Sequence, residues 1–209
     1  MSLSITLVII MITVLVSVMA FQNKEMLAKS MFNAYLVKHS KEWHRVITHA
    51  FVHSGFMHLA VNMYVLYMFG QMVERAFMRE SEVLGRVAYA ALYLGGIVFA
   101  TLPAYQKHQN NWNYNAVGAS GAVAAVLFSA IYFAPTMDLY LMFIPIPIPA
   151  IIFGIGYLAL EWYMDKKSND NIAHDAHFWG AAFGVAFSLL MFPSQFGPFI
   201  NAILRRFMP

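Results

Sequence analysis

Four polar side chains that could do chemistry fall inside long apolar stretches of this sequence. Ser120 lies in GASG, His177 lies in AHFWG, and His58 and Asn62 lie four residues apart in HLAVN. A serine hydroxyl becomes an effective nucleophile when an adjacent base takes its proton, and a neutral imidazole suits that task. We therefore interpret Ser120 as a candidate nucleophile and His177 as its candidate general base.

The other two polar residues could stabilise negative charge. His58 and Asn62 share one face of a helix because they are four residues apart. Both can donate hydrogen bonds to a developing oxyanion, and the backbone N–H of Ser120 can join them. Asp175 precedes His177 by two residues, so on a helix it points away and is not a third member of the set. The residues indicate acyl transfer.

The composition places these residues in a membrane protein. Of the 209 residues, 60% are apolar and 11% are charged, whereas an ordinary soluble domain has roughly 45 to 50% apolar and about 25% charged residues. The net charge of +3 is small and its basic residues are scattered, so nucleic acid is not an expected partner. The absence of cysteine excludes disulfides and thiolate metal sites.

The chain contains six apolar stretches, each close to the roughly 20 residues that a helix needs to cross a bilayer. Backbone groups in lipid must bond to one another, so we expect helices there. The expected fold is an all-α bundle of six transmembrane helices in one domain, residues 1–209. The expected helices are 3–21, 56–73, 86–103, 116–134, 146–164 and 176–193.

The first stretch could also be a secretory signal, because Val18 and Ala20 resemble a cleavage site. It lacks a basic start, however, and its apolar run exceeds the usual length of about 7 to 15 residues. We expect a retained helix. Further along, Glu74 belongs to a mixed-charge run expected to be a solvated helix hairpin. The fourth loop runs into Pro145, Pro147 and Pro149, which exclude a continuous helix there.

Helix parity brings the four polar residues together. If every stretch spans once, the second, fourth and sixth helices enter the membrane from the same side. Ser120, His177, His58 and Asn62 all lie near the starts of these helices, so we expect them at one shallow level. A channel or transporter would need polar groups continuing to the other face, and here they stop at one level.

Two other kinds of site have candidate residues at this level. His174 and His177 could suggest a metal, but no HExxH motif and no third ligand accompany them, so no metal is expected. Glu161 could mark an ion path. Its position near the end of the fifth stretch favours a solvated carboxylate at the interface instead.

Taken in order, the motifs resemble the rhomboid intramembrane proteases of the six-helix bacterial type, from Trp43 to Gly184. The resemblance is carried by RVITHAFVHSGFMHLAVN, by VGASGA, which matches GxSG, and by AHFWGAAFG, which matches AHxxGxxxG. It implies a Ser120–His177 dyad and an oxyanion hole lined by His58 and Asn62. The remaining motif residues are Arg45 in a membrane-embedded first loop, Gly118 and Gly121 around the serine, and Gly180 and Gly184, which would let the sixth helix approach the fourth closely.

The sequence departs from this pattern at two places. Members of the family often have an aromatic ring four residues after the serine, beneath the imidazole, and this chain has Ala124 there. We expect His177 to be held less firmly as a result, unless Phe128 or Trp179 fills the space. In addition, the tryptophan that usually adjoins the loop arginine is displaced, because His44 separates it from Arg45.

The resemblance implies a serine endopeptidase that needs no cofactor and cleaves transmembrane segments of membrane proteins within the lipid bilayer. It also implies a multi-pass protein of the bacterial inner membrane, with a cytoplasmic N-terminus and a site that opens to the outer side. That orientation puts five basic residues inside and eight outside, contrary to the positive-inside rule. The alternative is a non-catalytic rhomboid-like protein that binds transmembrane helices, and such a protein would be expected to lack Ser120 or His177.

Overall fold

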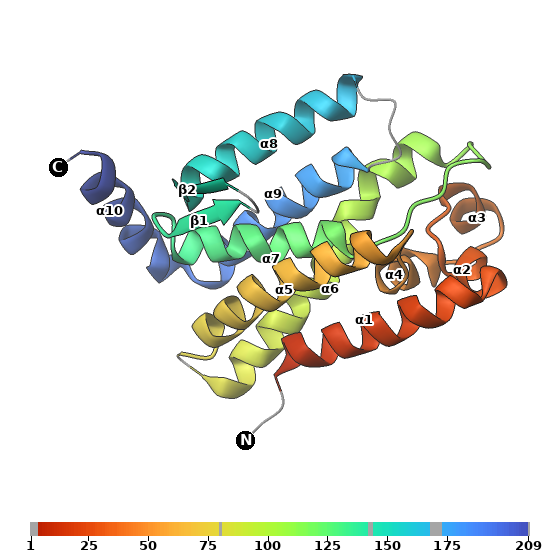
Figure 1. Cartoon of the computed structure of the whole chain (residues 1–209), viewed down its shortest axis with the longest axis horizontal. Helices are drawn as coiled ribbons and strands as arrows, with labels where there is room; N and C mark the ends of the chain where they lie inside the picture. Colours follow the sequence, from red (N-terminus) through yellow and green to blue (C-terminus); the bar gives the residue numbers. More distant parts are fainter. Residues whose placement is uncertain (1–3, 80, 142–143, 168–172, 209) are drawn as a thin grey trace.

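The computed structural model describes residues 4–79, 81–141, 144–167 and 173–208, so residue 3, where the first expected helix begins, lies outside the described residues. Helices dominate the described chain, and six of them lie over the six apolar stretches (Figure 1). These six are α1 (Ile5–Gln22), α5 (Phe56–Phe77), α6 (Glu82–His108), α7 (Ser120–Phe133), α8 (Ala150–Lys167) and α9 (His174–Met191).

The helices differ in how they could relate to a bilayer. Among the described residues, α1, α5 and α6 are long and apolar enough to cross a membrane singly. The chain bends by 100° after α9 into η2 (Pro193–Gln195) and α10 (Phe196–Phe207), and this bent pair passes the same criteria together. Helix α10 ends with Arg205 and Arg206 in its last turn. A helix with a basic end and a large apolar face suits the membrane interface.

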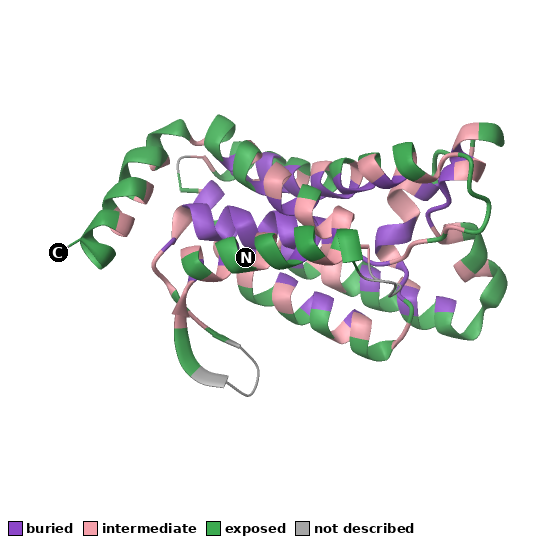
Figure 2. Ribbon diagram, turned by 90° about the horizontal axis from the view of Figure 1, so that it is seen from above, coloured by how far each residue is buried: buried purple, intermediate pink, exposed green. Residues whose placement is uncertain are grey.

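Helix α7 occupies the centre of the bundle. Every residue from Gly121 to Tyr132 is buried, and the helix contacts α5, α6 and α9 along its length. Figure 2 shows these buried segments inside the molecule, whereas α10 is largely exposed. At only 14 residues, α7 is shorter than its expected stretch, because the segment before Ser120 is not helical.

Small residues let α9 lie directly against α7. A Cβ atom added to Gly180 would collide with the carbonyl oxygen of Gly121, and one added to Gly184 would collide with that of Ala125. On the other side of α7, a Cβ on Gly121 would collide with the Cβ of Ala100 in α6. These contacts fix the distance between α7 and α9, and they therefore set the separation of Ser120 and His177.

The first loop folds into short helices at one end of the bundle (Figure 1). Arg45 is 5% exposed, and its guanidinium bonds the Glu42 carboxylate at 2.7 Å and the carbonyl oxygens of Ala28 and Met31 at 2.7 and 2.9 Å. Arg45 thus ties the loop together. The loop comprises α2 (Lys24–Ser30), α3 (Ala34–His39), α4 (Arg45–Thr48) and η1 (His49–Phe51).

Glu74 is not solvated, contrary to the expectation for its mixed-charge run. It lies within α5, is 2% exposed and faces the start of α1. Its carboxylate accepts hydrogen bonds from the Ile5 and Thr6 amides at 2.7 and 3.1 Å, and from the Ser4 and Thr6 hydroxyls at 2.6 and 2.8 Å. An anion is favourable at a helix N-terminus, where amides lack partners. Glu74 therefore anchors α1 to α5.

A short hairpin precedes α8. Strands β1 (Asp138–Leu141) and β2 (Ile144–Pro149) pair antiparallel, with Asp138 opposite Pro149. The expected helix start at residue 146 is wrong, because the chain stays extended until Ala150. Proline lacks an amide donor and clashes with a preceding helical turn, so the alternating prolines favour this extended path.

Candidate active site

Ser120 and His177 meet at one end of the bundle. The Nε2 atom of His177 lies 2.8 Å from the Oγ atom of Ser120. Ser120 is the first residue of α7 and His177 lies in the first turn of α9. Both are half-buried, so the pair is shielded from bulk solvent yet still accessible. This spacing is within hydrogen-bond reach for a nucleophile and its base.

The start of α7 provides backbone donors beside the hydroxyl. Because α7 begins at Ser120, the amides of its first turn have no carbonyl one turn earlier in the same helix. Their dipoles add to a partial positive charge at this helix end. A negative charge that develops next to Ser120 Oγ would therefore lie against the Ser120 amide.

His58 covers the segment that leads into Ser120. A Cβ atom added to Gly118 would lie 2.6 Å from Cε1 and 2.9 Å from Nε2 of His58, so the ring packs on this glycine. Gly118 also has a φ of +115°, which L side chains rarely adopt. The His58 Nδ1 atom lies 3.1 Å from the Ser54 hydroxyl. When Ser54 donates to Nδ1, Nε2 carries the proton and can donate toward an oxyanion.

Asn62 lies one turn below His58 and supports it. Its side chain is 5% exposed, and its amide group donates to the His58 carbonyl at 2.9 Å. An amide has two donor hydrogens, so one remains for a second partner. His58 therefore packs on the segment before Ser120, and Asn62 bonds to the backbone of His58.

Two further histidines of the first loop hold the backbone around Ser120. The His49 carbonyl accepts from the Gly118 amide at 2.9 Å, and His53 Nε2 accepts from the Ala119 amide at 3.4 Å. Burial lowers the pKa of His53 to about 3, so its ring is neutral near pH 7 and Nε2 can accept. His49 and His53 are thus hydrogen-bonding groups of the loop, and they pre-form the segment that carries the nucleophile.

Glu161 joins the same site, and here the sequence-based expectation of a solvated carboxylate is wrong. Glu161 is 7% exposed. Its Oε1 atom lies 3.0 Å from Nδ1 of His177, and its Oε2 atom lies 2.5 Å from Nδ1 of His174. Asp175 makes no comparable contact with His177; its Oδ1 atom accepts from the Ala176 amide at 2.8 Å. The carboxylate at the imidazole comes from α8.

Glu161, His174 and His177 also form a set of possible metal ligands, so the expectation that the two histidines have no third ligand is wrong. Tetrahedral ligands about 2.0 to 2.1 Å from zinc lie about 3.3 Å from one another. The distance from Glu161 Oε2 to His174 Nδ1 is 2.5 Å, which fits a direct hydrogen bond better than two ligands around an ion.

We therefore expect a chelator to leave activity unchanged. Purified protein treated with EDTA and then dialysed should match untreated protein in any cleavage of a substrate, because a serine–imidazole pair needs no ion for proton transfer. Loss of cleavage with EDTA, followed by recovery on adding zinc, would contradict this expectation.

The position beneath the imidazole is filled in a way that the sequence did not reveal. Ala124 is 3% exposed and packs in a cluster with Phe128 and Ala181, among others. The ring of Tyr157 in α8 contacts that of His177, with ring centroids 6.5 Å apart and an angle of 29° between the planes. Trp179 is 50% exposed. Tyr157, rather than Phe128 or Trp179, flanks the imidazole.

This packing indicates that a ring introduced at position 124 would meet a filled core rather than an open space. Ala124→Tyr should lower both turnover and thermal stability, because overpacking a filled core typically costs about 1 to 3 kcal/mol. Ala182→Tyr, at a half-buried position of α9, is a suitable comparison. Turnover and melting temperature measured on the same preparation decide the question. A faster enzyme with unchanged stability would show that His177 is loosely held.

Comparison with known proteins shows the family of the chain. The model of the Rhomboid domain matches residues 40–194, a range that includes Ser120, His177, His58, Asn62 and Glu161. The chain belongs to the rhomboid family. It is consequently a multi-pass membrane protein, and its all-α bundle is of the rhomboid type.

Several curated rhomboid proteins are similar in sequence. RHOMBOID-like protein 12, mitochondrial, of Arabidopsis thaliana is 36% identical over 150 residues, which are 66% of this chain and 44% of that protein. Presenilin-associated rhomboid-like protein A, mitochondrial, of Danio rerio is 30% identical over 67% of this chain and 35% of its own length. The YdcA protein of Bacillus subtilis is 32% identical over 39% of this chain and 37% of its own length. This rhomboid thus spans less than half the length of the relatives it matches.

Proposed function

We propose that this rhomboid is an intramembrane serine endopeptidase that cleaves transmembrane segments of membrane proteins with a Ser120–His177 dyad. The observation that carries the proposal is the distance of 2.8 Å between His177 Nε2 and Ser120 Oγ at the half-buried start of α7. Sequence relatives that are named as rhomboid-like proteins support the family, and this geometry supports the chemistry.

The reaction follows from the two side chains. Ser120 Oγ bonds to the carbonyl carbon of the scissile peptide while His177 Nε2 takes the hydroxyl proton. The carbonyl electrons move to the oxygen, where the Ser120 amide and His58 stabilise the oxyanion. The C–N bond then breaks, and the amine leaves with the proton from Nε2. Water, deprotonated by His177, hydrolyses the acyl ester and regenerates Ser120.

The space beside Ser120 supports a substrate with a small residue at the cut. A small cavity lies between the Ser120 segment, the first loop, α6 and α9, and most of its walls are alanine and glycine. His49, Thr101 and Ser120 supply polar groups there. A site enclosed by helices at the end of the bundle also requires the substrate helix to unwind, because a scissile carbonyl within a helix is already hydrogen-bonded.

We also propose a location in the bacterial inner membrane, with the N-terminus in the cytoplasm and the site opening to the outer side. The bacterial relative supports this placement, whereas the plant and fish relatives are named as mitochondrial. Single cysteines introduced at the α5–α6 turn and after α8, probed from each side with a membrane-impermeant maleimide, distinguish the two orientations.

The experiment that tests the proposed function uses purified protein in liposomes with a single-span model substrate. Two fragments should appear, and mass spectrometry should place the cut within or at the edge of the apolar segment. If folded protein binds the substrate and produces no fragments, the non-catalytic alternative is correct.

A further inference from the structure

The imidazole of His177 is bonded on both sides. Its Nε2 atom faces Ser120 Oγ at 2.8 Å, and its Nδ1 atom faces Glu161 Oε1 at 3.0 Å. A carboxylate can only accept a hydrogen bond, so the proton of a neutral imidazole belongs on Nδ1. Nε2 is then left with its lone pair toward Ser120. That is the one tautomer in which His177 can take the serine proton.

The carboxylate is itself held in place. Its second oxygen, Oε2, lies 2.5 Å from Nδ1 of His174, one helical turn before His177. The Glu161 and His174 side chains are each 9% exposed, and that of His177 is 16% exposed. Little water can therefore compete for these bonds. His174 and His177 of α9 thus each contact one oxygen of the Glu161 carboxylate from α8.

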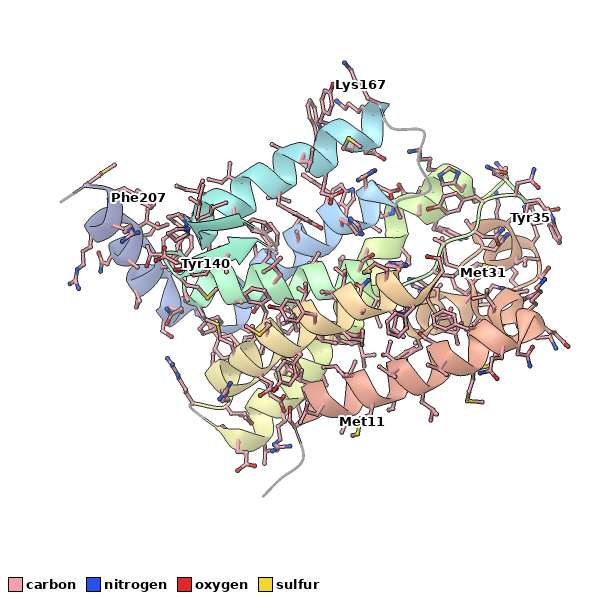
Figure 3. The ribbon with its side chains drawn as sticks, in the orientation of Figure 1. Met11, Met31, Tyr35, Tyr140, Lys167 and Phe207 are labelled. Atoms are coloured by element: carbon pink, nitrogen blue, oxygen red, sulfur yellow. The ribbon has the colours of Figure 1, made fainter. Side chains whose placement is uncertain are left out.

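The direction of α8 explains why Glu161 reaches this level. Figure 1 shows α8 running toward the end of the bundle at which α5, α7 and α9 begin. In Figure 3 the label of Lys167, the last residue of α8, marks the end of that helix, above the start of α9. Glu161 lies less than two turns before Lys167, so its carboxylate meets the first turn of α9.

We propose that Glu161 is a positioning residue that completes a Ser120–His177–Glu161 triad, with His174 holding the second carboxylate oxygen. Glu161 fixes the tautomer and plane of the imidazole and stabilises the imidazolium that forms when Nε2 takes the serine proton. It does not accept that proton. This role rests on the proposed function, and it supplies the orientation that an aromatic residue at position 124 does not provide in this chain.

Glu161→Gln tests the role with little change in shape. A glutamine amide could donate to Nδ1, which would move the imidazole proton to Nε2 and leave no acceptor for the Ser120 hydroxyl. We expect kcat to fall on the order of 10²- to 10⁴-fold with KM nearly unchanged, as for other residues that orient a catalytic histidine. The rate at which a fluorophosphonate labels Ser120 should fall in parallel, because that reaction requires the same proton transfer.

Three comparisons separate positioning from a structural effect. Asp175→Asn removes a carboxylate two residues from His177 that does not touch its ring, so wild-type rates are expected. Glu161→Asp keeps the charge at a shorter reach, so it should recover part of the lost rate. Melting temperatures of all variants should stay close to that of wild type. Wild-type kcat and labelling rate in a folded Glu161→Gln protein would overturn the proposal.

A measurement on the unmutated protein keeps the proposal testable if Glu161→Gln does not fold. The protein is labelled with ¹⁵N-histidine, and the His177 signals are identified as those missing from the NMR spectrum of His177→Ala protein. These signals should show a ring with its proton on Nδ1 at neutral pH. A ring protonated on Nε2 would overturn the proposal. If folded wild-type protein neither cleaves the substrate nor reacts with the fluorophosphonate, the proposed function is wrong. The tautomer of His177 then still shows whether Glu161 orients its ring.

Discussion

Replacing Ser120 or His177 with alanine is expected to lower the cleavage rate on the order of 10⁶-fold, which corresponds to about 8 kcal/mol of transition-state stabilisation. The two side chains lie 2.8 Å apart and perform a single step together. Either loss should therefore remove nearly the whole effect, and the double variant should be no slower than the single ones. Initial rates with a fluorogenic transmembrane substrate give the three values.

Controls for this result are a serine and a histidine far from the dyad. Ser194→Ala and His44→Ala change exposed side chains of the same types, so both proteins should cleave at the wild-type rate. All variants should elute as the same species in detergent and unfold at similar temperatures. Turnover by either dyad variant within about tenfold of wild type would exclude Ser120 and His177 as nucleophile and base.

Replacing His58 with alanine is expected to reduce kcat on the order of 10²- to 10³-fold, the usual effect of losing one oxyanion donor. The substrate affinity of a Ser120→Ala background should not change, because these donors act mainly in the transition state. Asn62→Ala should have the smaller effect of the two, since the Asn62 amide already donates to the His58 carbonyl. Kinetics in liposomes and binding to the Ser120→Ala protein separate the two quantities.

The outcome that would contradict this role is specific. If His58→Ala weakened substrate binding to the Ser120→Ala protein and left turnover at saturation intact, His58 would be part of the binding surface. Ser54→Ala refines the result, because the Ser54 hydroxyl lies 3.1 Å from His58 Nδ1 and sets which nitrogen carries the proton. A smaller loss than that of His58→Ala is expected there.

Most of the site could be predicted from the sequence because alternate membrane helices begin on the same side. Costly polar groups inside apolar stretches are few, so Ser120, His58 and His177 could be recognised by type and depth alone. Alternate helices begin on the same side, and the structure indeed brings these three residues together at one end of the bundle. The bounds of helices were less predictable, as the extended prolines before Ala150 and the late start of α7 at Ser120 illustrate.

Glu161 was not predicted to join the site, because the parity argument covered only the starts of the second, fourth and sixth apolar stretches. By the same parity, the end of the fifth stretch, residues 146–164, lies on that side as well, next to the start of the sixth. Two further clues were the cost of a carboxylate in an apolar stretch and the histidines at 174 and 177. Sequence alone does not say whether such a carboxylate turns inward or outward.

Glu74 shows the same limit in a structural setting. Its charged neighbours indicated a solvated turn, yet its carboxylate binds the free amides at the start of α1, 69 residues away in sequence. The contact satisfies the unpaired amides at the N-terminus of α1. Those amides are a property of α1, so the sequence around Glu74 gives no sign of them. Contacts between distant elements were predictable where a motif marked the residue, as GASG marks Ser120, and not for Glu74, which lies among other charged residues.

The most direct measurement of the Ser120–His177 pair is mass spectrometry of the protein after reaction with a fluorophosphonate. The reagent forms a stable covalent bond with an activated serine oxygen, so its site of attachment identifies the nucleophile independently of any substrate. The predicted result is a single adduct on Ser120 in wild type, with none in folded His177→Ala protein. No adduct on folded wild type, or an adduct on another residue, would contradict the assignment.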